Sequence, residues 1–130
     1  MKKHKKKNLS PRKKKIQEAR KLAKFYRRQI EKAEDLIEII DRLLAYDGTP
    51  EFNGNVIILE LPEADGVEYI ELSHREHMAL VHTDSAERLK ENKAFLQSRI
   101  DKCQENLSRT LEILDALRTK PKEELEGKYY

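Results

Sequence analysis

The sequence contains a single cysteine, Cys103, no tryptophan, and only four glycines and four prolines. One cysteine excludes an intramolecular disulfide, which is typical of a reducing intracellular compartment. No apolar run has the length of a signal peptide or a membrane span, and the basic start is not followed by an apolar segment. We therefore expect a cytoplasmic, nucleoid or nuclear protein that does not enter a membrane.

Charged residues (39%) are as frequent as apolar ones (38%), a balance that favours long solvated helices over a thick globular core. The net charge of +3 conceals a separation of charge along the chain. Residues 1–28 carry 14 Lys and Arg and one acid, whereas residues 29–130 carry 13 basic and 23 acidic residues. Such a gradient steers a chain to a polyanion or to an acidic protein, and it equally lets the tail of one copy lie on the acidic surface of another.

Two stretches have the periodicity of long helices, residues 11–46 and residues 84–119. Ser10 and Pro11 suit the start of the first helix, Asp84 with Glu87 suits a capping box at the second, and Pro121 is expected to end it. Apolar residues recur at alternating spacings of four and three, which predicts a coiled-coil seam. The predicted seam residues are Tyr26, Ile30, Ile37, Ile40, Leu44, Leu89, Leu96, Ile100, Leu107 and Leu114.

The stretch between these helices has the composition of short strands. We predict strands at residues 55–61, 67–73 and 78–82, a hairpin turn at Asp65-Gly66, and a left-handed Gly48 after the first helix. The first strand is apolar on both faces, so one face is left for another subunit. The predicted oligomer interface consists of Val56, Ile58, Ile70 and Leu72.

Two seams of similar length joined through a β block predict an antiparallel helical hairpin. The expected fold is mainly α with a small antiparallel β block, forming one domain over residues 11–120. A flexible basic arm (residues 1–10) precedes this domain and a frayed tail (residues 121–130) follows it.

The stretch VEYIELSHREHMALVHTDSAERLKENKAFLQSRIDKCQENL, residues 67–107, resembles the region of alpha-class prefoldin subunits where two strands lead into the C-terminal helix. The helix start is marked here by Thr83, Ser85 and Ala86. The resemblance implies oligomerisation through the β block, helix tips that grip non-native proteins, and no nucleotide or metal. Two features depart from the family: His74-Arg75-Glu76-His77 replaces its Gly-rich turn, and the basic arm is foreign to it.

The basic start is the strongest functional signal, because Lys-rich segments neutralise phosphates and release counterions. Ser10-Pro11-Arg12-Lys13 is also similar to the Ser-Pro-basic motifs of chromatin proteins, and Phe25 and Tyr26 lie where they could stack on bases. The alternatives are a solubilising or targeting tail, or docking to an acidic protein. The predicted nucleic-acid-binding residues are Lys5, Lys6, Lys7, Arg12, Lys13, Lys14, Lys15, Arg20, Lys24 and Arg28.

No catalytic or metal site is predicted. His74, His77 and His82 lack the further ligands that zinc needs, and Cys103 sits at a seam position as a small buried residue. There is no Gly-rich phosphate loop, no nucleophile elbow and no carboxylate isolated among apolar residues. We therefore expect a non-enzyme without a cofactor.

Three functions fit these observations. The first is a binding and assembly protein whose basic start contacts nucleic acid or a ribonucleoprotein and whose β block drives homo- or hetero-oligomerisation. The second is an ATP-independent holdase of the prefoldin type. The third is an accessory or inhibitor protein of a mobile element that binds a nucleic-acid-handling enzyme.

Overall fold

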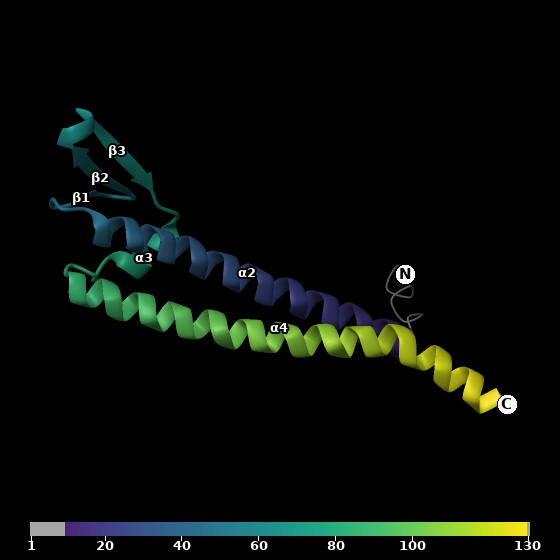
Figure 1. The fold of residues 1–130 in the computed structure, drawn as a ribbon. Helices are drawn as coiled ribbons and strands as arrows, with labels where there is room; N and C mark the ends of the chain where they lie inside the picture. The colour runs from purple at the N-terminus through teal and green to yellow at the C-terminus, as the bar shows by residue number, and fades with distance from the viewer. Residues whose placement is uncertain (1–9, 130) are drawn as a thin grey trace, which may run out of the picture. The chain divides into compact units, whose positions relative to one another are not determined.

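The computed structural model describes the backbone of residues 10–129 and the side chains of residues 10–119. The fold is mainly helical with a small antiparallel sheet, which confirms the predicted fold class. The predicted arm lies outside the described residues except for Ser10. Within the described part, no helix is both long and apolar enough to cross a membrane. The elements are α2 (Pro11–Ala45), β1 (Glu51–Asn53), β2 (Val56–Leu61), the 3-10 turn η1 (Pro62–Ala64), β3 (Gly66–Glu71), α3 (His74–Leu80) and α4 (Ala86–Tyr129) (Figure 1).

Helix α2 begins where the sequence predicts. The backbone N–H of Lys13 donates to Ser10 Oγ at 3.1 Å, and Pro11 occupies the first helical position, where its missing N–H leaves no bond unmade. The helix ends at Ala45, and the N–H of Tyr46 donates to the carbonyl of Leu43 at 3.3 Å. This tight last bond closes the helix without a left-handed residue, so the left-handed conformation predicted for Gly48 is wrong.

The sheet has the strand order β1-β2-β3, and both pairs are antiparallel. Strand β1 was not predicted, because Asn53-Gly54 indicates a turn and the short stretch before it was assigned to the same loop. Gly54 has a φ of 62°, which glycine adopts without steric cost, and the chain reverses there into β2. The hairpin between β2 and β3 is turned by η1 and by Asp65 in the left-handed conformation, φ 52°.

The predicted third strand, residues 78–82, is wrong, because this stretch belongs largely to helix α3. A capping box starts that helix. The N–H of Glu76 donates to Ser73 Oγ at 3.2 Å, and the N–H of Ser73 donates to Glu76 Oε1 at 2.9 Å. Two orphan donors of the first turn are thereby satisfied, which outweighs the strand-like composition of Met78 to His82.

Helix α4 differs from the prediction at both ends. It starts at Ala86, and its cap is Ser85 rather than Asp84: the N–H of Arg88 donates to Ser85 Oγ at 3.2 Å. It continues to Tyr129, so the stop predicted at Pro121 is wrong. Pro121 lies among Lys, Glu and Leu, which favour a helix.

The chain divides into two compact units. Unit 1 contains the described residues 10–31 and 100–129, that is, the start of α2 and the later part of α4. Its core is thin. Tyr26, Ile30 and Leu107 of the predicted seam are half-buried. The buried residues are Ala19, Ala23, Ile100, Cys103, Thr110 and Leu114.

Unit 2, residues 32–99, holds the sheet, α3 and the adjoining parts of α2 and α4. Its core consists of larger side chains, of which Ile40, Ile57, Leu59 and Leu80 have almost no exposed surface. Leu89 and Leu96 of the predicted seam are buried there too, whereas Ile37 and Leu44 are only half-buried. Leu36 and Leu43 are buried beside them, because the apolar side of α2 widens in this unit.

Candidate nucleic-acid interface

The start of α2 carries a continuous basic face. At about 100° per residue, Lys13, Arg20, Lys21, Lys24, Arg27 and Arg28 fall on one side of the helix. All six are exposed. The packed side of the same helix consists of the buried Ala19 and Ala23 and the half-buried Ile16, Tyr26 and Ile30. The basic face is therefore held in one orientation by the packing of the other side of the same helix.

None of the six basic side chains forms an ion pair with another described side chain. The situation in unit 2 is different. There Arg42 pairs with Glu68, and Lys93 Nζ lies 2.7 Å from Asp41 Oδ1. The basic face thus keeps its charges available to an external anion, whereas these two cations of unit 2 are already engaged.

Of the predicted nucleic-acid-binding residues, Lys13, Arg20, Lys24 and Arg28 belong to this face. Lys5, Lys6 and Lys7 lie outside the described residues. Arg12, Lys14 and Lys15 are exposed, but their spacing places Arg12 and Lys15 on other sides of the first turns and Lys14 at the edge of the face. The predicted set omitted Lys21 and Arg27, which the 3.6-residue period assigns to the face.

Two aromatic rings adjoin the basic face. Phe25 is 52% exposed, and its ring meets that of Tyr26 edge-to-face with the centroids 5.6 Å apart. Lys21 precedes Phe25 by four residues and Arg28 follows it by three, so these cations border the exposed ring. Tyr26 is half-buried on the packed side of α2. Phe25 is therefore the ring that a base could reach.

The predicted oligomer interface is divided between the two faces of the sheet. Val56 and Ile58 are half-buried on the face that also carries the exposed Val67 and Tyr69. Ile70 belongs to the other face, opposite the buried Ile57, and Leu72 is itself buried within the chain. Alternation along β2 explains the division, because neighbouring side chains point to opposite faces. Leu72 therefore has to be removed from the predicted interface.

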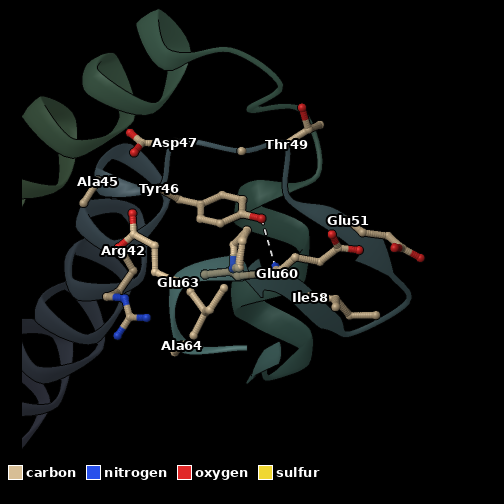
Figure 2. A pocket seen from close by; sticks show the side chains of 14 residues that line it. Arg42, Ala45, Tyr46, Asp47, Thr49, Glu51, Ile58, Glu60, Glu63 and Ala64 are labelled. Atoms are coloured by element: carbon tan, nitrogen blue, oxygen red, sulfur yellow. Dashed lines mark hydrogen bonds between the residues drawn. The ribbon is translucent and has the colours of Figure 1, made fainter. Parts of the chain in front are cut away.

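A pocket of about 840 Å³ lies in unit 2 where the end of α2 meets the sheet (Figure 2). The Tyr46 ring crosses it, and the N–H of Glu60 donates to Tyr46 Oη at 2.9 Å. A Cβ added to Gly48 would lie 2.8 Å from that oxygen, so glycine makes room for the ring. The carboxylates of Asp47, Glu51, Glu60 and Glu63 line the pocket together with one cation, Arg42, which pairs with Glu68.

The three histidines occupy separate positions. His74 and His77 belong to α3, whereas His82 lies in the turn after it. Among the side chains that the structure describes, no group of three His, Cys, Asp or Glu residues is arranged to hold a metal ion. Cys103 is a buried free cysteine of unit 1.

A helix–sheet–helix plan can arise in unrelated chains, so the plan assigns no function. The exposed side chains of the basic face and of the sheet are the features that bear on function. No protein-family model, curated protein or solved structure matches this chain.

Proposed function

We propose that this chain is a non-enzymatic binding protein that contacts the phosphate backbone of nucleic acid through the start of α2 and the residues before it. One observation carries the proposal: six exposed cations share one side of a single helix and have no ion-pair partner among the described side chains. A rigid row of cations follows a phosphate backbone without reading its sequence. Binding is therefore expected to be sensitive to salt and tolerant of sequence.

The first test measures fluorescence anisotropy of a labelled duplex against the full chain between 50 and 200 mM salt. The slope of log K against log [salt] is about −0.9 for each neutralised phosphate. The quadruple variant Arg20→Gln, Lys24→Gln, Arg27→Gln, Arg28→Gln should therefore flatten the slope by about 3.6. Removing residues 2–9, which contain five lysines, shows separately how much the segment before α2 contributes to the salt slope.

A matched control makes the same change of charge elsewhere. Lys32→Gln, Arg75→Gln, Lys90→Gln, Lys102→Gln neutralises four exposed cations outside the basic face. This control should keep the salt slope of the unaltered chain. Equal slopes for the two quadruple variants would mean that net charge alone drives binding and would contradict the proposal, as would a slope near zero for the unaltered chain.

The exposed ring of Phe25 distinguishes the kinds of nucleic acid. Stacking on an unpaired base is worth about 1–3 kcal/mol, and duplexes present no free base face. Phe25→Ala should therefore weaken binding to a single strand by about 5- to 150-fold while leaving duplex binding almost unchanged. An equal loss of affinity for both ligands would mean that Phe25 does not stack on bases, and only the phosphate contacts of the proposal would remain.

A second candidate function is the binding of non-native proteins, as the prefoldin resemblance implies. The observation in its favour is that unit 1 exposes four large apolar side chains, Leu22, Phe25, Leu111 and Ile113. Suppression of the aggregation of an unfolding client, without nucleotide, tests it. The variant Leu22→Ser, Ile113→Ser should lose this suppression and keep nucleic-acid binding, which separates the two functions.

A further inference from the structure

One face of the sheet combines apolar and acidic side chains in cross-strand rows. The register places Glu51, Ile58 and Tyr69 in one row, Asn53, Val56 and Glu71 in the next, and Glu60 beside Val67. These rows share a face because Val56, Ile58 and Glu60 alternate along β2. We refer to Glu51, Val56, Ile58, Glu60, Val67, Tyr69 and Glu71 as the acidic-rimmed face.

This face is open to a partner. Tyr69 is 65% exposed and Val67 is 46% exposed, whereas Ile57 and Leu59 on the other face are buried. Glu51, Ile58 and Glu60 also line the pocket beside Tyr46, so the face continues into a concave surface (Figure 2). Glu51, Glu60 and Glu71 form no ion pair with any of the side chains described.

The charge of the face determines which partner fits. Two copies that met through this same face would bring like carboxylates together, which opposes a symmetric contact. A segment rich in lysine is complementary. Its ammonium groups reach the carboxylates, its aliphatic stems cover Ile58 and Val67, and a cation over the Tyr69 ring adds a cation–π contact.

The chain itself carries such a segment, with nine Lys and Arg in residues 1–15 and no acid. We propose that the basic start of one copy binds the acidic-rimmed face and the adjoining pocket of a second copy. The contact is head-to-tail, so each copy offers one basic segment and one acidic face. Such contacts extend into longer assemblies or close into rings.

The test needs no nucleic acid, so its failure and the failure of the proposed function are distinguishable. Sedimentation velocity of the full chain should show association at 50 mM NaCl that is lost at 500 mM, because salt screens exposed ion pairs. Removal of residues 1–15 should abolish the association at 50 mM NaCl. Undiminished association of the shortened chain, or a monomer at every protein concentration at low salt, overturns the proposal.

A second measurement locates the contact. A labelled peptide of residues 1–15 is titrated with the shortened chain. The variant Glu51→Gln, Glu60→Gln, Glu71→Gln should bind it about tenfold more weakly, the value of three exposed ion pairs together. The matched control Glu34→Gln, Glu91→Gln, Glu112→Gln removes the same charge elsewhere and should bind within about twofold of the shortened chain without these substitutions.

Equal losses in both triple variants would show attraction to net charge alone and overturn the proposal. Tyr69→Ala should weaken binding of the peptide several-fold. Tyr69→Phe should leave binding unchanged, because a phenylalanine ring retains the cation–π contact. Circular dichroism of each variant establishes that it is folded. Equal binding by the alanine and phenylalanine variants would place the peptide away from this face and contradict the proposal.

Discussion

The start of α2 in unit 1 and the sheet region of unit 2 differ in the size of their packed side chains and in the ion pairing of their cations. In unit 1 the packed side of α2 includes Ala19 and Ala23, and an exposed side of the same helix carries six cations that form no ion pair with a described side chain. In unit 2 the packed residues are Ile40, Ile57, Leu59 and Leu80, and Arg42 and Lys93 are paired with acids. Unit 2 has the features of a stable core, whereas the six cations at the start of α2 form no ion pair with a described side chain.

The largest expected effect comes from the core of unit 2. Ile40→Ala should lower the free energy of unfolding by about 2–5 kcal/mol, because Ile40 has no exposed surface and its removal leaves a cavity. Urea unfolding followed by circular dichroism measures the loss. Ile113→Ala, at a side chain that is 57% exposed, is the control and should change stability by less than about 0.5 kcal/mol. Similar losses would contradict the contrast between core and surface.

The next effect concerns the Tyr46 ring in the pocket and its hydrogen bond to Glu60. Gly48→Ala should lower stability by about 1–3 kcal/mol, because the new Cβ forces the Tyr46 ring away from Glu60. Tyr46→Phe removes only the hydrogen bond and should cost about 1 kcal/mol. In the double variant the two losses should not add, since both act on the same ring. Full additivity in thermal unfolding would mean that Gly48 acts independently of Tyr46.

The third effect has the opposite sign. Lys24 has like-charged neighbours at all four helical contact positions: Arg20, Lys21, Arg27 and Arg28. Each like-charge pair costs about 0.2–0.5 kcal/mol, so Lys24→Gln should raise stability by about 1 kcal/mol at low salt while weakening nucleic-acid binding. The gain should shrink in 1 M NaCl.

Lys90→Gln is the control for that substitution. Lys90 lies three residues after Glu87 and three residues before Lys93, so its neutralisation removes one attraction and one repulsion, which nearly cancel, and should not stabilise the chain. Denaturant titrations of both variants at two salt concentrations give the comparison. A stabilising effect of both substitutions would show that repulsion is spread over the whole chain, and the special status of the basic face would be lost.

The long helices were predictable because heptad spacing persists over many turns. Smaller elements were not. Met78 to His82 has the composition of a strand, yet the capping box of Ser73 and Glu76 makes the stretch helical. That signal was present in the sequence as Ser-x-x-Glu, but the apolar run outweighed it in the prediction.

The candidate sites were predictable in part, for the same physical reasons. Charge counting found the basic start, and helical spacing assigns Lys21 and Arg27 to its face. Alternation along the strands predicts two faces but not which one the rest of the chain covers, so Leu72, which directly follows β3, was misplaced. The Tyr46–Glu60 hydrogen bond joins residues 14 positions apart through the geometry of a turn, and no local pattern encodes it.

The alanines on the packed side of α2 have a consequence for how the basic face responds to its ligand. Ala19 and Ala23 bury little apolar surface, so the first turns of α2 gain less from packing than the turns around Ile40. Amide hydrogens of residues 12–31 should therefore exchange with solvent faster than those of residues 36–44. A polyanion that binds only the folded form would slow exchange by the factor 1 + [L]/Kd, where [L] is the free polyanion concentration. Hydrogen exchange then measures occupancy of the basic face directly, amide by amide, without a label on either partner.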